Sequence, residues 1–321
     1  MTGGAGYIGA HCVRALRESG AEVVIYDDLS TGHRAAAEAV GARLVVAPLD
    51  DREALRRTLV EGFDAVMHFA ARALVGESTR RPLWYFEQNV GSTLTLLSEM
   101  SRAGVRRLVF SSSCAIYGAP AYLPVDEAHP IGPLSPYGRS KLMVEQILDE
   151  LRQREGLQAT SLRYFNAAGA HPDGSLGESH DPETHLIPLA LAAAAGDREA
   201  LSIYGRDYDT PDGTCVRDYV HVLDLADAHL RALRALMDGA PGGAYNLGTG
   251  RGRSVLEVLD AVGRVTGLTV PVIDAPRRDG DPPGLWAGAE KARAELGWSP
   301  RYTSLDAIVE TAWRWYQRER A

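Results

Sequence analysis

The sequence predicts an α/β protein, with a doubly wound parallel sheet followed by a smaller mixed α/β region. In the first half, short runs rich in Val, Ile and Leu alternate with longer helical patterns, and strands separated in this way form parallel sheets. From about Asn166 the alternation stops, and loops rich in Gly, Pro, Asp and Ser separate shorter elements. We therefore expect one domain over residues 1–166 and a second over residues 167–321.

The expected strands are short apolar runs, typical of strands that helices cover on both faces. They are Glu22–Tyr26, Arg43–Val46, Ala65–Phe69, Leu108–Ser112 and Thr160–Tyr164. The expected helices between them are Tyr7–Ser19, Arg52–Glu61, Pro82–Ala103 and Tyr137–Arg154. Gly243–Leu247 is a further strand segment, and we expect it to return to the main sheet from the second domain.

Composition excludes several classes of protein. Lys and Arg number 34 against 42 Asp and Glu, which gives a net charge of −8. This acidic balance disfavours nucleic acid as a partner, because phosphate-binding proteins are normally basic. Cys12, Cys114 and Cys215 are an odd number without paired spacing, which disfavours a disulfide framework. With no membrane-length apolar run and no signal-peptide pattern, we expect a soluble cytoplasmic protein.

The chain opens with closely spaced glycines. Gly3, Gly6 and Gly9 follow a GxxGxxG spacing, and a helical pattern begins directly after them. Such glycines permit a tight turn and close approach of a pyrophosphate, which the helix N-terminus then binds. The next expected strand ends in Asp27, 18 residues after Gly9. A carboxylate there suits a ribose 2′-hydroxyl, so the pattern predicts NAD rather than NADP.

The strand that should precede this motif is largely missing. Only Met1 and Thr2 come before Gly3, whereas the first strand of a doubly wound sheet is central. We expect that Met1 is an internal or misread start and that the natural protein is slightly longer.

A serine, a tyrosine and a lysine follow the glycine motif along the chain, and these residue types suit redox chemistry on a hydroxyl. Ser113 ends an expected strand, and Tyr137 and Lys141 lie four residues apart, on one face of an expected helix. A neighbouring ammonium and a positively charged nicotinamide ring would favour the phenolate of Tyr137. That tyrosine can then take a proton from a sugar hydroxyl while hydride leaves the same carbon, with Ser113 hydrogen-bonded to the hydroxyl.

Motifs along nearly the whole chain resemble the extended short-chain dehydrogenase/reductases, and among them the UDP-hexose 4-epimerases. They are TGGAGYIG, YDDLSTGHR, HFAA, VGES, FSSSCAIYG, SPYGRSKLMVEQIL, LRYFNAAGAHP, VRDYVHVLDLADAH, YNLGTG and RRDGD. The resemblance implies a Rossmann-type sheet, bound NAD, a homodimer and reversible inversion at C4 of a UDP-hexose. UDP-galactose and UDP-glucose would interconvert through a 4-keto sugar.

The resemblance also implies roles for individual residues. Ser113, Tyr137 and Lys141 match the catalytic positions. Cofactor-binding positions match Gly3, Gly6, Tyr7, Ile8, Gly9, Asp27, Asp28, Phe69, Ala70, Ala71, Asn89 and Phe165. Substrate-binding positions match Asn166, Tyr204, Arg217, Tyr219, Arg278 and Asp281. The two arginines suit a diphosphate, which guanidinium groups bind bidentately.

Three positions depart from the family pattern. Pro48 stands where the family has an aspartate that holds adenine, and Asp50 or Asp51 are the possible substitutes. A family lysine falls on Ala73, with Arg72 as a possible stand-in. Leu285 occupies the position that, in the family, decides whether bulky N-acetyl sugars fit. It is neither the smallest nor the largest choice, so substrate breadth stays open.

Other functions compete with this hypothesis. UDP-N-acetylhexosamines or UDP-pentoses are alternative substrates for the same epimerisation. A nucleotide-sugar 4,6-dehydratase is less favoured, because Cys114 and Ala115 stand where similar dehydratases have an Asp-Glu pair. A non-catalytic NAD-binding regulator is disfavoured by the intact Ser113, Tyr137 and Lys141.

No metal site is expected from the sequence. His221 and His229 lie eight residues apart near two aspartates, but without a recognised metal-binding spacing, and we interpret them as polar groups satisfied within a helix. Cys114 follows Ser113 without a recognisable activating histidine, so it is expected to pack as a small residue.

The helical segments Pro82–Ala103 and Tyr137–Arg154 could pair two subunits as a four-helix bundle.

Overall fold

The main sheet of the computed structural model is parallel, and the model describes residues 1–278 and 280–320. Its strand order is β2-β1-β3-β4-β5-β10, with Thr2 bridging β1 and β3. The strands are β1 (Val24–Asp27), β2 (Arg43–Val46), β3 (Val66–His68), β4 (Arg107–Ser111), β5 (Gln158–Tyr164) and β10 (Gly242–Leu247). This is the predicted doubly wound α/β sheet, and the segment Gly243–Leu247 returns to it as predicted, in parallel with β5.

The first residues occupy the centre of the sheet without forming a full strand. The Thr2 amide donates to Met67 O at 3.0 Å, and the Phe69 amide donates to Thr2 O at 2.9 Å. On the other side, the Tyr26 amide donates to Met1 O at 2.8 Å. The first strand is thus represented by a single bridging residue, in agreement with the sequence prediction.

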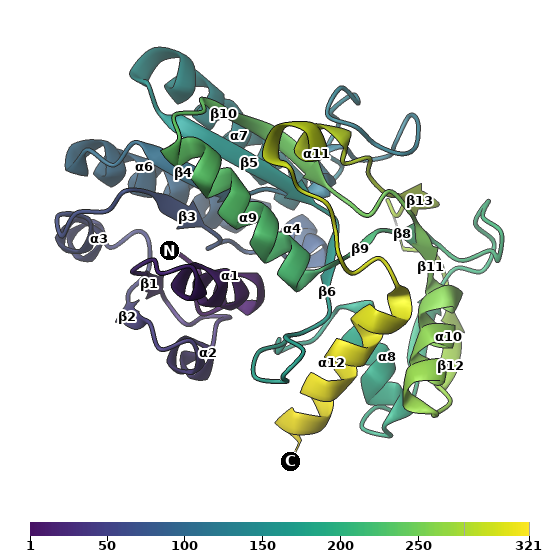
Figure 1. Ribbon diagram of the computed structural model, residues 1–321. Coiled ribbons are helices and arrows are strands. Elements are labelled where there is room, and N and C mark those ends of the chain that lie inside the picture. The colour runs from purple at the N-terminus through teal and green to yellow at the C-terminus, as the bar shows by residue number, and fades with distance from the viewer. Residues whose placement is uncertain (279, 321) are drawn as a thin grey trace.

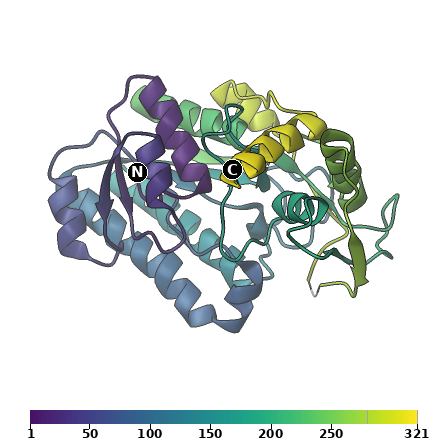
Figure 2. The same cartoon turned by 90° about the horizontal axis from the view of Figure 1, so that it is seen from below.

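Helices cover the sheet on both faces (Figure 1). They are α1 (Tyr7–Glu18), α2 (Arg34–Ala39), α3 (Arg52–Leu59), α4 (Val75–Arg80), α5 (Pro82–Phe86), the π-helical turn η1 (Glu87–Gly91), α6 (Ser92–Ala103), the 3₁₀ turn η2 (Cys114–Ile116), α7 (Pro136–Glu155) and α9 (Val222–Met237). Figure 2 shows α1 and α9 on one side of the sheet and the blue helices around α6 on the other. Within the described chain, no helix is both long enough and apolar enough to cross a membrane.

The predicted strands and helices differ from the observed ones by at most two residues at their ends, with one exception. The segment predicted as one helix over Pro82–Ala103 consists of α5, η1 and α6 in succession. The short helices α2 and α4 were not predicted, because six residues give too little periodicity to recognise.

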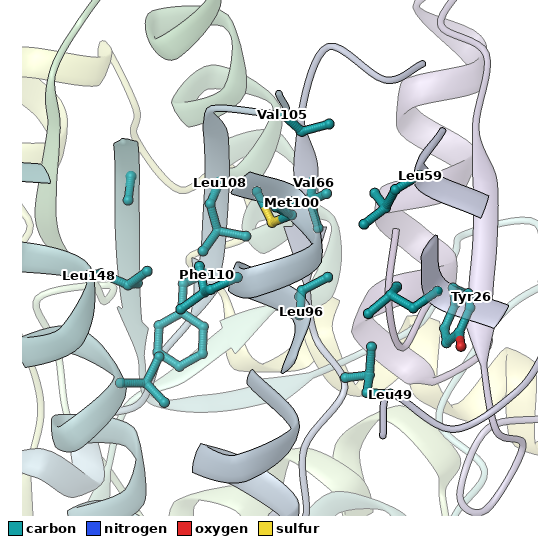
Figure 3. Packing of buried hydrophobic residues seen from close by; sticks show 14 of the residues in the cluster. Tyr26, Leu49, Leu59, Val66, Leu96, Met100, Val105, Leu108, Phe110 and Leu148 are labelled. Atoms are coloured by element: carbon teal, nitrogen blue, oxygen red, sulfur yellow. The ribbon is translucent and has the colours of Figure 1, made fainter. Parts of the chain in front are cut away.

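The core of the first half lies between the sheet and the helix layer of α3, α6 and α7. Leu96 and Met100 of α6 pack against Leu108 and Phe110 of β4 and Val66 of β3 (Figure 3). Full burial of such side chains stabilises the fold by about 1.5–3 kcal/mol each. This packing fixes the strands whose carboxyl ends carry the candidate site.

The second half is mixed, as predicted. Its strands form small sheets and are β6 (Asn166–Ala168), β7 (Leu201–Tyr204), β8 (Val216–Arg217), β9 (Tyr219–His221), β11 (Arg253–Ser254), β12 (Val272–Ala275) and β13 (Gly284–Leu285). Its helices are α8 (Leu186–Ala194), α10 (Val255–Thr266), α11 (Glu290–Leu296) and α12 (Leu305–Glu319). Helices α8, α10 and α12 share one apolar core. They lie beyond the carboxyl ends of the main strands (Figure 1).

Candidate active site

The glycine turn between Thr2 and α1 is packed against main-chain atoms. Gly3 has φ +71°, and a Cβ there would lie 2.5 Å from Ala70 N. A Cβ on Gly9 would lie 2.1 Å from Gly3 O, so the first turn of α1 touches the strand end directly. Helix α1 begins at Tyr7, with Ile8 beside it, and its free N–H groups face the turn. This cradle fits a pyrophosphate, which needs close approach to a backbone without side chains.

Two aspartates end β1 beside this turn. Asp27 is buried, and its carboxylate accepts from the amides of Ala5 and Leu29, both at 2.9 Å. Burial raises the pKa of Asp27, and these two amides oppose the rise. Asp28 is exposed and lies 3.7 Å from the Arg72 guanidinium. Asp27 therefore positions the glycine turn, while both carboxylates line the same pocket.

That pocket joins the ends of three strands. It contains Gly3 and Gly6, the two aspartates, and Phe69, Ala70 and Ala71 after β3. The sequence analysis missed other residues that line it, namely Ser30, Thr31, Gly32, Leu49, Gln88 and Ser92. The loop after an acid-tipped strand was a signal for the first three. Gln88 and Ser92 lie four residues apart, as on one face of a helix, but they belong to no recognisable local motif.

The structure separates the candidates for the family's adenine-binding aspartate. Pro48 and Asp50 both line the pocket. Asp51 caps α3 instead, because its side chain accepts from the Ala54 amide at 2.9 Å. Of the two acids, Asp50 is the one that lines the pocket.

Asn89 links the loop after β3 to helix α7 by hydrogen bonds. Its side chain accepts from the Arg72 amide at 2.8 Å and donates to Arg72 O at 3.0 Å and to Ser140 Oγ at 2.9 Å. Asn89 lies in η1, and π-helical turns are frequent at functional sites. Arg72 itself lines the pocket, 5.1 Å from the Trp84 ring centroid. It is placed where the lysine stand-in was expected.

Ser113, Tyr137 and Lys141 lie at the carboxyl end of β4. Ser113 follows the strand and caps η2, accepting from the Ala115 amide at 3.2 Å. Tyr137 stands in the first turn of α7, which Ser135 caps, and Lys141 follows one turn later. Lys141 Nζ donates to Ser111 O at 2.7 Å and lies 5.9 Å from the Tyr137 ring centroid. The structure therefore brings all three together.

The pKa values of Tyr137 and Lys141 depend chiefly on burial. Burial raises the pKa of Tyr137 to about 12, and a hydrogen bond with Ser113 opposes the rise. Burial lowers the pKa of Lys141 to about 7, opposed by the Glu145 carboxylate. The sequence analysis expected a lowered pKa for the tyrosine, from the lysine together with a positive nicotinamide ring. In the chain alone, burial raises the pKa of the tyrosine instead, and the opposing influence comes from Ser113.

A buried ion pair joins α7, the helix that carries Tyr137 and Lys141, to the neighbouring strand β5. Glu145, one turn after Lys141, accepts from Ser112 Oγ at 2.5 Å and pairs with the Arg163 guanidinium of β5 at 2.5 Å. Arg163 also donates to Tyr117 Oη at 2.9 Å. The sequence analysis missed this network. Its signal was an arginine inside an apolar strand, since a buried charge requires a partner.

Charged and aromatic groups of the second half of the chain contact one another in pairs. Arg217 of β8 donates to Asp281 Oδ1 at 2.9 Å, and the guanidinium of Arg278 lies 3.9 Å from the Tyr204 ring centroid. Burial raises the pKa of Cys114 to about 12, and the largest opposing influence is the charge of Arg217. Arg217 is also paired with Leu285, and Cys114, the residue after Ser113, packs against the buried cluster that contains Leu285.

Three predicted residues lie at the end of β5 or beside it. Phe165 and Asn166 follow β5, and Asn166 of β6 pairs with Tyr219 of β9. Phe165 and Leu285 belong to one buried cluster, with Leu285 paired to Arg217 across β13 and β8. Leu285 therefore lies beside Arg217 and in the same buried cluster as Phe165.

The two histidines considered for a metal site bond to their own surroundings. His221 Nδ1 accepts from the Leu223 amide at 3.1 Å, and its Nε2 lies 3.0 Å from Thr311 Oγ1. His229 Nδ1 lies 2.8 Å from Leu225 O, one turn earlier in α9. The interpretation as a satisfied polar group is confirmed for His221. It is only partly right for His229, because its Nε2 is buried without a hydrogen-bond partner among the described residues.

Comparisons with known proteins point in one direction. The model of the NAD dependent epimerase/dehydratase family matches residues 1–248. A UDP-glucose 4-epimerase of Lacticaseibacillus casei is 49% identical over 318 residues, covering 99% of this chain and 96% of that protein. Another from Streptomyces lividans is 50% identical, covering 98% and 95%. The crystal structure of the Brucella ovis UDP-glucose 4-epimerase in complex with NAD superposes with a TM-score of 0.94 at 47% identity, covering 97% and 96%.

Proposed function

Because this chain belongs to the NAD dependent epimerase/dehydratase family, we propose that it is a UDP-glucose 4-epimerase, interconverting UDP-galactose and UDP-glucose. The observation that carries the proposal is the position of Ser113, Tyr137 and Lys141. They lie at the end of β4, in the same sheet whose neighbouring strand ends line the dinucleotide pocket, and Cys114 beside them packs against the cluster that contains Leu285, the partner of Arg217. A sugar hydroxyl bound there would contact Tyr137 as its base. The nucleotide cofactor would lie on one side of it and the diphosphate-binding arginines on the other.

The cofactor is NAD, and the cradle around Gly3 and Gly9 fits it. The glycine turn and the N-terminus of α1, with Gly6, Tyr7 and Ile8, hold its pyrophosphate. Asp27 and Asp28 lie where a ribose would bind and would repel a 2′-phosphate. When bound, NAD would supply a reversible hydride acceptor for the sugar C4. Phe69, Ala70, Ala71, Asn89 and Phe165 complete this side.

Tyr137 is the general base and acid at the sugar 4-hydroxyl. It takes the proton as the C4–H bond breaks and gives it back when that bond re-forms. Ser113 hydrogen-bonds the same hydroxyl and orients it, and Lys141 supplies positive charge behind the phenol. Because burial holds the pKa of the phenol at about 12, the site needs that charge to stabilise the phenolate.

The substrate's diphosphate and uridine are held by the second half of the chain. We assign this role to Asn166, Tyr204, Arg217, Tyr219, Arg278 and Asp281. Arginine forks bind phosphate oxygens bidentately, and Asp281 keeps the Arg217 fork in place. Residues 1–166 then form the cofactor domain, and residues 167–321 supply mainly the substrate contacts.

A product assay tests the activity. The protein is incubated with UDP-galactose and the products are separated by chromatography, with UDP-N-acetylgalactosamine and UDP-xylose in parallel. We expect UDP-glucose from UDP-galactose. A stable 4-keto-6-deoxy product would indicate a dehydratase, turnover of the other sugars alone would shift the substrate, and no turnover would indicate a regulator.

We further propose a homodimer joined through the helix layer of α6 and α7. Leu83, Leu94 and Met143 are large apolar side chains exposed on α5, α6 and α7, by 69%, 47% and 42%. Exposed apolar side chains on neighbouring helices are typical of subunit interfaces. Light scattering should give the mass of two chains, and Leu94→Glu should give one. Ile273→Glu, which changes an exposed residue of β12, is the control.

Three unpaired cysteines support a reducing, cytoplasmic location as part of the same proposal. Cell fractionation followed by immunoblotting would test it. Recovery of the protein from a membrane or secreted fraction would contradict it.

A further inference from the structure

Four metal-ligating side chains converge in the loop between β6 and α8. Glu178, His180, Glu183 and His185 each offer one ligand atom, and these atoms lie within 4.8 Å of one another. All four come from eight consecutive residues. The sequence analysis weighed only His221 and His229 as metal ligands, so this cluster was missed.

Both imidazoles of the cluster turn the same atom toward one carboxylate oxygen. His180 Nδ1 lies 3.1 Å from Glu178 Oε1, and His185 Nδ1 contacts that same oxygen more closely. The Glu178 side chain is only 6% exposed. Within residues 1–278 and 280–320, the two rings are its ion-pair partners. A buried carboxylate requires positive charge, which either two protonated rings or one metal ion can supply.

Glu183 is held in an orientation that leaves one oxygen for the cluster. Its Oε1 accepts from the amides of Thr184 at 2.7 Å and His185 at 2.8 Å. Its Oε2 lies 3.7 Å from His180 Nδ1. Metal-binding carboxylates are characteristically oriented by such outer hydrogen bonds. The loop backbone therefore orients this ligand, with the main chain of His185 as one of its two donors.

We propose that Glu178, His180, Glu183 and His185 form a structural zinc site. Zinc takes imidazole nitrogen and carboxylate oxygen in tetrahedral sites, at about 2.0–2.1 Å, which requires ligand atoms about 3.4 Å apart. The contacts of His180 with Glu178 and Glu183, at 3.1 and 3.7 Å, lie on either side of that value. Imidazole ligands favour zinc over magnesium or calcium. Four protein ligands leave no open position, so the ion would be structural.

The site would fasten the loop to two distant parts of the chain. Trp315 Nε1 of α12 donates to Glu178 O at 2.9 Å, and His33 Nε2 lies 2.8 Å from Ser179 O. The His180 ring meets the edge of Tyr7, the first residue of α1, with ring centroids 6.3 Å apart. A metal ion here would hold the segment that links the glycine turn with the C-terminal helix. Its effect would be on stability, whatever reaction the protein catalyses.

Metal content tests the proposal directly. The NAD-loaded protein, prepared without a histidine tag, is dialysed against EDTA, exposed to Zn²⁺, desalted and analysed by mass spectrometry. We expect about one zinc per chain, and a rise in Tm of several degrees with Zn²⁺ but not with Mg²⁺. His180→Ala should bind only background zinc. His171→Ala, which changes a histidine of the same loop that pairs with Asp173, should keep the full content.

A second variant covers the case in which His180→Ala does not fold. Glu183→Gln retains an oxygen for the two backbone amides but removes the carboxylate ligand, so zinc affinity should fall by about tenfold or more. Cobalt in place of zinc should give the visible absorption of a tetrahedral site in the wild type. Background zinc in the wild type, or equal zinc in the wild type and His180→Ala, would overturn the proposal in favour of two protonated histidines.

Discussion

The two sides of the proposed active site, one for the cofactor and one for the substrate, are built by different means. The cofactor side is made by main-chain contact, since a Cβ on Gly3 or Gly9 would meet backbone atoms within 2.5 Å. The substrate side is made by charged side chains from distant segments, such as Arg217 and Asp281, which are 64 residues apart in sequence. A backbone cradle tolerates no added atom, whereas side-chain pairs can be altered one at a time. Substitutions in the backbone cradle should therefore have larger effects than substitutions in the side-chain pairs.

The largest effect is expected at the cradle. In Gly9→Val the new Cβ would lie 2.1 Å from Gly3 O and 2.9 Å from Gly4 Cα, and neither backbone atom can move without displacing α1. We expect no NAD-loaded protein to be recovered, as measured by absorbance of the released nucleotide. Gly263→Ala, in the interior of α10 with 3.6 Å to its nearest neighbour, is the control and should be slightly stabilising. NAD retention by Gly9→Val would refute the cradle.

The next effect is expected behind the catalytic lysine. Glu145→Gln removes one partner of a buried ion pair and leaves Arg163 uncompensated, so the free energy of unfolding should fall by about 3 kcal/mol. Urea denaturation measures it. Glu150→Gln, whose partner Arg154 is exposed on the same helix, should change stability by less than about 1 kcal/mol. Equal losses in the two variants would show that the buried pair contributes nothing special.

A smaller effect is expected on the substrate side. Arg217→Lys keeps the charge but loses the fork that binds phosphate and Asp281, so the KM for UDP-galactose should rise about tenfold with little change in kcat. Steady-state kinetics checks this. Arg206→Lys alters an exposed arginine paired with Asp274 and should leave KM unchanged. A loss confined to kcat would place Arg217 in the chemical step instead.

The smallest effect is expected at the adenine end. Asp50→Asn should weaken NAD binding by about threefold, because a neutral amide oxygen accepts a weaker hydrogen bond than a carboxylate does. Asp51→Asn should leave NAD affinity unchanged, because asparagine also caps helices well. Calorimetric titration of the NAD-depleted protein measures both. The opposite ranking would assign the adenine contact to Asp51.

The same contrast explains what the sequence could predict. Gly3, Gly6 and Gly9 are close in sequence, so their spacing reports the turn, and Tyr137 with Lys141 reports a helix face. The pairing of Glu145 with Arg163 joins a helix to a strand and has no local spacing. The cluster at Glu178 is local, but its spacing of E-x-H-x-x-E-x-H matches no familiar pattern. The arginines on the substrate side were found by resemblance to a family, not by their spacing.

The central claim is that Tyr137 moves the proton at a site whose cofactor grip is built separately. The most direct measurement is UDP-galactose turnover by Tyr137→Phe, with bound NAD quantified in the same sample. We predict that kcat falls by about 10²–10⁴-fold while NAD occupancy equals that of the wild type. Unchanged turnover, or a loss of activity that follows a loss of bound NAD, would contradict the account.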